Sequence, residues 1–228
     1  MMPRMDDVGT LYRQRFSDEE RRSKDALWRV LCTRFLQRYV RAGDTLLDLA
    51  CGYGEFSRHI VAGRKHAVDL NPDAAATLPP GTDFHVARAE ALDFLEDGSL
   101  DTCFTSNFLE HLPDKAAVDA VLREVHRVLK PGGSFLLIQP NVRYASHEYW
   151  DFWDHHVALS HLSCAEALQL AGFRIEECIP RFLPFSTKSA LPVRPWILAI
   201  YLALRPAWPL FGKQFFMVAR KQGGHAPR

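Results

Sequence analysis

A short glycine-containing segment near residue 50 has the residue types and spacing of a nucleotide-binding turn. An apolar run ends at Leu49, Gly52 and Gly54 follow, and a charged, helix-like segment comes next. Glycine lets the backbone approach a ligand where a Cβ atom would clash, and the start of a helix offers free N–H groups. An acid, Asp69, ends the next strand-like run, about 20 residues on, where Rossmann-like sheets hold ribose hydroxyls. The pattern predicts binding of a nucleoside-containing cofactor.

The glycine pattern narrows the choice of cofactor. A dinucleotide site expects G-x-G-x-x-G, and this chain has Ser57 in the third glycine position. The segment from Asp48 to Gly54 instead resembles motif I of the class I S-adenosylmethionine (SAM) methyltransferases, D-x-G-x-G-x-G, with Ala50 in place of the first glycine. The resemblance implies SAM as the cofactor. A tight strand-to-helix turn without a ligand is the alternative.

Two later segments extend this resemblance over residues 45–140. Residues 99–112 (SLDTCFTSNFLEHL) resemble the fourth-strand motif of the small-molecule branch of the family, and residues 122–133 (LREVHRVLKPGG) resemble the helix and turn after it. The resemblance implies a Rossmann-like, doubly wound α/β sheet of seven strands in the order 3-2-1-4-5-7-6, with strand 7 antiparallel. Residues 214–220 would form that seventh strand.

Apolar periodicity predicts alternating strands and helices, which is typical of a mostly parallel sheet covered on both faces. Pro131 and the two glycines after it are expected to stop a helix and start the next strand. The expected helices lie at residues 17–40, 55–62, 115–129 and 163–171. The expected strands lie at residues 45–49, 65–69, 83–87, 100–105, 134–139, 173–179 and 214–219.

A length of 228 residues lies within the single-domain range of α/β folds. A net charge of +1 argues against a nucleic-acid partner. Five scattered cysteines favour free thiols in a reducing cytosol, and the first 16 residues lack the apolar region of a signal peptide, so we expect a cytoplasmic protein. The expected parts are a helical cap (1–44), a SAM-binding domain (45–220) with an apolar insert (180–212), and a disordered tail (221–228).

The resemblance implies a set of cofactor contacts at the ends of four strands. Asp48 and the two glycines would face the methionine part of the cofactor, Asp69 would hold the ribose diol and Leu70 would pack on the adenine. Arg88 stands where the family often has an acid, and arginine cannot accept a hydrogen bond. Glu90, or backbone groups near it, would then form the hydrogen bond with the adenine. The full set is Asp48, Ala50, Gly52, Gly54, Asp69, Leu70, Ala89, Glu90, Asn107 and Leu109.

Two histidine-bearing segments are candidates for a catalytic base. His111 follows the fourth-strand motif and would face the reaction space, with a purely structural histidine as the alternative. Residues 147–156 (HEYWDFWDHH) gather aromatic, acidic and imidazole side chains on an expected active-site loop. Asp154 would orient His155 there, and a base of this kind contributes roughly 10²–10⁴-fold to rate. We favour His155 over His111. The alternative for this segment is an amphipathic helix whose aromatic residues pack.

The same loop contains metal-ligand residue types. On a helix, His147, Asp151 and His155 would share one face at i, i+4 spacing, with His156 beside them. Nothing in the sequence fixes this ligand set, and methyl transfer does not require a metal. We therefore expect no metal site.

The insert carries an apolar stretch at residues 195–204, far short of the roughly 20 residues that span a bilayer. A helix that covers the sheet or forms a homodimer contact is one interpretation. Peripheral contact with the inner face of a membrane, or with a lipid-linked substrate, is the other. Arg181, Lys188, Arg194 and Arg205 would then lie near headgroups.

These features predict a SAM-dependent methyltransferase acting on a small-molecule, sugar or lipid-linked acceptor, with O-methylation of a sugar hydroxyl as our first choice. The loop and insert also resemble bacterial methyltransferases of surface-polysaccharide or glycolipid assembly. A nicotinamide-dependent oxidoreductase or epimerase is an alternative that lacks its third glycine and a Tyr-x-x-x-Lys pair. A SAM-binding module without turnover is another.

Overall fold

The computed structural model describes residues 18–184 and 194–223. It consists of two compact units: residues 1–88 with 186–205, and residues 89–185 with 206–228. The expectation about a signal peptide concerns residues outside the described ranges, and so does most of the expected disordered tail. The first residue of the expected tail, Lys221, is not disordered, because it is the last residue of the final strand.

Seven strands form one sheet in the order β3-β2-β1-β4-β5-β7-β6. The pairs β1–β2, β2–β3 and β4–β5 are parallel, whereas β7 runs antiparallel to both β5 and β6. The expected order and the antiparallel seventh strand are confirmed. The strands are β1 (Thr45–Leu49), β2 (Arg64–Asp69), β3 (Thr82–Val86), β4 (Leu100–Ser106), β5 (Leu129–Pro140), β6 (Phe173–Ile179) and β7 (Gln214–Lys221).

The first unit holds β1 to β3 and the helices that flank them. The helix expected at residues 17–40 is two elements, because Phe35 leaves helical geometry with a φ of −131°. The next helix is also shorter than expected, since Ile60 is already extended. The helical segments of this unit are α2 (Asp18–Arg34), η1 (Leu36–Tyr39), α3 (Glu55–His59), η2 (Pro72–Thr77) and α7 (Pro195–Ala203).

The core of the first unit is built around the strands β1 and β2. Leu46, Leu47 and Leu49 of β1 are fully buried, and so are Ala67 and Val68 of β2. Continuous burial of this kind is typical of strands that are covered on both faces of a parallel sheet. Helix α2 packs against α3 and α7 within this unit. The apolar stretch of the insert is therefore partly a helix that packs on another helix.

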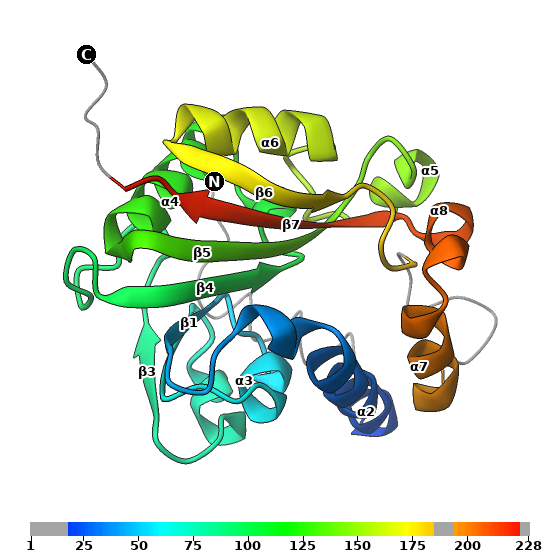
Figure 1. The fold of residues 1–228 in the computed structure, drawn as a ribbon, viewed down its shortest axis with the longest axis horizontal. Coiled ribbons are helices and arrows are strands. Elements are labelled where there is room, and N and C mark those ends of the chain that lie inside the picture. Colours follow the sequence, from blue (N-terminus) through cyan, green and yellow to red (C-terminus); the bar gives the residue numbers. More distant parts are fainter. Residues whose placement is uncertain (1–17, 185–193, 224–228) are drawn as a thin grey trace. The chain divides into compact units, whose positions relative to one another are not determined.

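The second unit holds β4 to β7. Helix α4 (Lys115–Val128) begins at Asp114, whose carboxylate accepts a hydrogen bond of 2.8 Å from the Ala117 N–H group. Such a cap satisfies one of the free N–H groups of the first turn. Helix α6 (His161–Leu170) begins at Ser160 with a reciprocal capping box and lies along β6 (Figure 1). The remaining segments are η3 (Leu109–His111), α5 (Ser146–Tyr149), η4 (Arg205–Ala207) and α8 (Trp208–Phe211).

The Pro-Gly-Gly sequence after α4 does not separate the helix from the strand as expected. Strand β5 starts at Leu129, directly after the helix, and contains the turn as an irregularity. Gly132 has a φ of +79°, which glycine adopts without steric cost. Regular pairing with β4 resumes at Ser134. The strand is consequently longer than the sequence predicts.

Candidate functional site

The turn after β1 is built from left-handed residues. Ala50, Gly52 and Gly54 have φ angles of 57°, 55° and 70°. Ala50, which replaces a family glycine, adopts a conformation that is unfavourable for a residue with a Cβ atom. A Cβ atom at Gly54 would lie 2.7 Å from Leu78 Cδ2, whereas one at Gly52 would meet nothing within 4 Å. A side chain at position 54 would therefore displace the end of the Leu78 side chain and adopt a strained φ, whereas open space faces position 52.

Asp69 ties the end of β2 to this turn. Its Oδ2 atom accepts a hydrogen bond of 2.8 Å from the Gly52 N–H group, and its Oδ1 atom accepts one of 2.9 Å from Asn71. The carboxyl is 9% exposed, and burial raises its pKa while the backbone N–H groups oppose that shift. A carboxylate oxygen can accept more than one hydrogen bond. Each oxygen can therefore accept a further hydrogen bond from a ligand hydroxyl.

Asp48 has a partner that the sequence reasoning missed. The Ser57 hydroxyl donates a hydrogen bond of 2.6 Å to Asp48 Oδ2, and both residues are buried. Burial raises the pKa of Asp48 to about 7, against the effect of this hydrogen bond. Ser57 is the residue that stands in the third glycine position of a dinucleotide motif. A serine at this position, where a dinucleotide motif has glycine, therefore helps to hold the Asp48 carboxyl in place.

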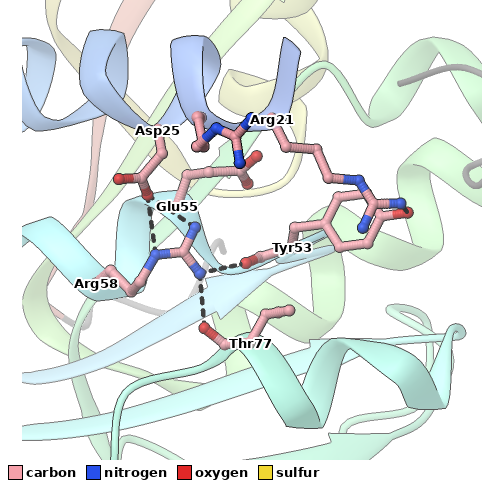
Figure 2. A pocket seen from close by; sticks show the side chains of 7 residues that line it. Arg21, Asp25, Tyr53, Glu55, Arg58 and Thr77 are labelled. Atoms are coloured by element: carbon pink, nitrogen blue, oxygen red, sulfur yellow. Dashed lines mark hydrogen bonds and ion pairs between the residues drawn. The ribbon is translucent and has the colours of Figure 1, made fainter. Parts of the chain in front are cut away.

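A cavity of about 300 Å³ lies beside the turn in the first unit (Figure 2). Arg58 donates to the backbone oxygens of Tyr53 and Thr77 at 2.7 and 2.6 Å and pairs with Asp25. Arg21 donates to the Tyr53 hydroxyl at 2.9 Å, and its guanidinium carbon is 4.2 Å from the centre of that ring. The cavity is lined by Arg21, Arg22, Asp25, Tyr53, Glu55, Arg58 and Thr77. Sequence reasoning missed this cavity, although Tyr53 between the two glycines was a signal for it.

The other expected cofactor contacts differ in exposure. In the first unit, Leu70 follows β2 and is half-buried. In the second unit, Ala89 is buried, Glu90 is half-buried, and Asn107 is exposed with a φ of 50°. Leu109 is fully buried, so its side chain packs in the core and only its backbone is a candidate for ligand contact. Of the expected set, the residues that the first unit brings together at the ends of β1 and β2 are Asp48, Ala50, Gly52, Gly54 and Asp69.

The second unit brings the two candidate bases together. The ring centres of His111 and His155 are 5.0 Å apart. Asp154, expected to orient His155, instead has its Oδ2 atom 3.2 Å from His111 Nδ1, and its backbone oxygen lies 3.0 Å from the same nitrogen. Burial lowers the pKa of His111, but hydrogen bonding to Asp154 and the charge of Glu110 outweigh it and raise that pKa.

Aromatic rings and a second acid surround His155. Its ring stacks on Phe152 and meets Tyr149 edge-on, each at 4.8 Å between ring centres. The buried residue Glu110 was not identified from the sequence, although it precedes His111 directly. Its backbone oxygen accepts hydrogen bonds from the N–H groups of His156 at 2.8 Å and Val157 at 3.1 Å. These bonds hold the loop that carries His155 against η3.

The ligand set considered from the sequence is not assembled. Helix α5 ends at Tyr149, so His147, Asp151 and His155 do not share a helical face. His147, Asp151 and His156 are exposed, whereas His155 is buried. The alternative of an amphipathic helix over residues 147–156 is not supported either, because α5 ends at Tyr149.

Comparison with known proteins finds similarity to methyltransferases over part of the chain. Residues 47–137 match a family model described as a methyltransferase domain. The ubiquinone/menaquinone biosynthesis C-methyltransferase of Rubrivivax gelatinosus is 35% identical over 114 residues, which cover 45% of this chain and 44% of that protein. A ubiquinone biosynthesis O-methyltransferase of Xanthomonas euvesicatoria is 33% identical over 42% of this chain and 43% of its own. This chain thus spans less than half the length of these curated relatives.

The solved structures agree with the strand order. A SAM-dependent methyltransferase from Archaeoglobus fulgidus superposes with a TM-score of 0.64 at 19% identity, over 86% of this chain and 94% of that one. Residues 47–137 therefore match a methyltransferase domain, and the chain has the fold of the solved SAM-dependent methyltransferases, which implies SAM as the methyl donor. The oxidoreductase alternative is not favoured by these findings.

Proposed function

We propose that this protein transfers a methyl group from SAM to a hydroxylated small molecule. One observation carries the proposal. Within the segment that matches the methyltransferase domain, Asp69 at the end of β2 accepts a hydrogen bond from the Gly52 N–H group in the turn after β1. This arrangement presents a carboxylate for ribose hydroxyls next to a backbone that a ligand can approach closely. A tight turn without a ligand role would not need open space at Gly52.

The residues of the first unit fit the chemical groups of SAM. Asp69 would hold the ribose diol and Leu70 would pack on the adenine. Arg21 would hold the carboxylate of the methionine part, because its Nε atom is buried without a hydrogen-bond partner among the described residues. Unsatisfied buried donors are costly, so a ligand acceptor there would be favourable. When bound, SAM supplies a methyl group on a positively charged sulfur, which becomes neutral on transfer.

The histidine cluster of the second unit is where we propose that the acceptor hydroxyl loses its proton. His111 is oriented by Asp154, and His155 is oriented by the rings around it. Two oriented imidazoles side by side are suited to positioning a nucleophile and removing its proton. In this arrangement His111 is the better-oriented base, in contrast to the choice made from the sequence.

A ring-bearing acceptor with an apolar carrier fits the surfaces of the chain best. Trp150 and Trp153 of the loop after α5 are 57% and 95% exposed, and such rings stack on flat or sugar-like ligands. Trp196, Ile197 and Ile200 of α7 are also exposed. The named relatives act in quinone biosynthesis, which supports a quinone-type ring over a free sugar. A glycolipid acceptor is the second choice, since it shares the apolar carrier.

Calorimetry with SAM and with NAD tests the cofactor. Wild-type protein should bind SAM and not NAD, and Asp69→Ala should weaken SAM binding by about 1.5–3 kcal/mol, the range for hydrogen bonds to a charged group. Asp93→Ala changes an exposed acid away from the turn and should leave the affinity unchanged. Wild-type affinity in Asp69→Ala would remove this residue from the ribose role. Equal binding of NAD would favour the oxidoreductase alternative.

Turnover tests the rest of the proposal. Transfer of a labelled methyl group to hydroquinones and to lipid-linked sugars should reveal a preference for one class. His111→Ala and His155→Ala should each lower kcat by at least about 10²-fold if the acceptor is deprotonated at this cluster. Tight SAM binding without transfer to any acceptor would favour a SAM-binding module. Changes in kcat below about tenfold in both variants would favour a nucleophile that needs no base, such as an amine.

A further inference from the structure

Three side chains of the second unit converge with the residue types of a metal site. Glu110 and His111 belong to η3, directly after β4, and His155 comes from the loop after α5. Each offers one ligand atom, and these atoms all lie within 4.8 Å of one another. A search of the described residues for three or more histidines, cysteines and acids with ligand atoms this close finds these three residues. None of these three residues lies on an exposed loop tip, because two are buried and one is half-buried.

Glu110 gives an independent reason to expect a cation. The residue is 1% exposed, and its Oε2 atom has no hydrogen-bond partner among the described residues. A buried carboxylate is stable only when it is paired, protonated or bound to a metal. A bound cation would compensate the buried charge.

His111 is oriented as metal-binding histidines usually are. Its Nδ1 atom faces Asp154, through both the carboxylate at 3.2 Å and the backbone oxygen at 3.0 Å. This contact leaves Nε2 as the ring nitrogen for a ligand bond. Histidine ligands typically donate their other ring N–H group to a carboxylate or carbonyl, which fixes the tautomer and raises the basicity of the ligand.

The third ligand is held in place by the surrounding chain. The rings of Tyr149 and Phe152 flank the His155 imidazole, and the Tyr149 hydroxyl donates to the backbone oxygen of Val157. The N–H groups of His156 and Val157 donate to the Glu110 backbone oxygen. The loop is therefore bonded to the same short element that carries the other two ligands.

We propose that Glu110, His111 and His155 bind one divalent transition-metal cation, with zinc as the best match. Two imidazoles and one carboxylate form a ligand set that zinc accepts, and three protein ligands leave a coordination position open. Zinc bonds to nitrogen and oxygen are about 2.0–2.2 Å long, so two ligand atoms on one ion are at most about 4.4 Å apart. Side-chain movements of about an ångström or less would close the site. This proposal replaces the expectation that no metal binds.

The open position gives the cation a role in the reaction, and this step rests on the proposed function. An acceptor hydroxyl bound there would have a lowered pKa and would release its proton to water. The resulting oxygen forms its bond to the methyl carbon while the carbon–sulfur bond of the donor breaks, and the electron pair stays on sulfur. In the metal-bound protein the two histidines would be ligands, and the cation would activate the acceptor in place of the imidazole base of the proposed function.

Metal titration of the full chain tests the site without relying on turnover. Protein treated with a chelator is titrated with Zn²⁺ by calorimetry and with Co²⁺ by visible absorption, which reports the coordination of the ion. Wild-type protein should bind one equivalent tightly. Glu110→Gln and His155→Ala should each weaken binding by at least about tenfold, the range for loss of a ligand or its support. The double variant His147→Ala/His156→Ala removes exposed histidines from the same loop and should bind as wild type does.

The outcomes separate this proposal from the proposed function. SAM calorimetry on each variant reports whether the fold and the cofactor site persist, so weak metal binding with normal SAM binding supports the site. Absence of a stoichiometric metal in wild-type protein that binds SAM would overturn the metal proposal and leave the methyltransferase proposal intact. Loss of metal binding in the double variant, with wild-type binding in Glu110→Gln and His155→Ala, would assign the metal to exposed residues and overturn it as well.

Discussion

Asp48 is a buried acid whose protonation is linked to folding. Burial raises its pKa to about 7 in the folded chain, whereas an unfolded aspartate has a pKa of about 3.9. Between these values the folded state holds a proton that the unfolded state has released. The free energy of unfolding therefore falls as the pH rises from about 4 to about 7, and this group contributes no further change above that range.

Asp48→Asn should remove this contribution. Urea unfolding of wild type and variant at pH 5, 6, 7 and 8 should give curves that differ in slope below about pH 7 and run parallel above it. Glu110 is also a buried acid with a raised pKa, but it is present in both proteins and cancels in the difference. Asp93→Asn serves as a matched exposed control. Parallel curves for wild type and Asp48→Asn throughout would show that Asp48 is ionised in the folded state across this range.

At the residue scale, the sequence identified most chemical groups but not their partners. Spacing along the chain pointed to Asp48, Asp69 and the glycines, because one strand-to-helix turn places them together. It did not pair Asp154 with His111, since these residues are 43 positions apart and meet only through the folded loop. Glu110 was missed because a glutamate next to a histidine gives no sign of burial. Burial and convergence come from tertiary packing, which periodicity does not report.

At the scale of elements, the junction between α8 and β7 depends on Gly212. A Cβ atom there would lie 2.4 Å from the carbonyl carbon of Arg181 and 2.7 Å from the Phe182 nitrogen. Both are backbone atoms, so a rotamer change cannot relieve the contact. The Arg181 side chain also donates a hydrogen bond of 2.9 Å to the Gly212 oxygen. Close backbone approach of this kind is a reason for glycine at a strand entrance.

Gly212→Ala should lower the free energy of unfolding by about 1–3 kcal/mol, the usual cost of forcing extra volume into a packed site. Gly43→Ala is the control, because a Cβ atom at Gly43 would meet nothing within 4 Å. Urea unfolding with unchanged m-values measures both. A Gly212→Ala variant within about 0.5 kcal/mol of the control would mean that the junction relaxes at little cost.

Local sequence patterns predicted the strands better than the short helical segments. All seven strands were expected close to their observed positions, apart from the early start of β5. Short helical segments such as η2, η3, α5 and α8 were not expected, since three to six residues contain too little periodicity to detect. The split at Phe35 and the early start of β5 reflect backbone geometry and strand pairing, which residue types alone do not encode.

At the scale of the whole molecule, composition and surface point to different partners. The near-neutral charge gives no indication of a nucleic-acid partner, and no helix among the described residues is long and apolar enough to cross a membrane. Helix α7 nevertheless packs on α2, with Leu198 and Leu202 buried, and it exposes Trp196, Ile197 and Ile200. Exposed Arg194 precedes this helix and exposed Arg205 follows it. An apolar face flanked by cations is typical of a helix that lies in a membrane interface.

We therefore expect the protein to bind vesicles that contain anionic lipid, as an enzyme for an apolar acceptor would need to do. Trp196→Ser/Ile200→Ser should weaken binding by at least about tenfold, because burial of each side chain contributes about 1.5–3 kcal/mol when complete. Leu170→Ser removes an apolar residue that is 85% exposed at the end of α6 and should leave binding unchanged. Co-sedimentation at low and high salt measures both the apolar and the cationic contributions, since salt weakens only the latter. Equal binding of the α7 variant and the Leu170 control, or no binding by wild-type protein, would assign the exposed face of α7 to another contact, such as a second copy of the chain.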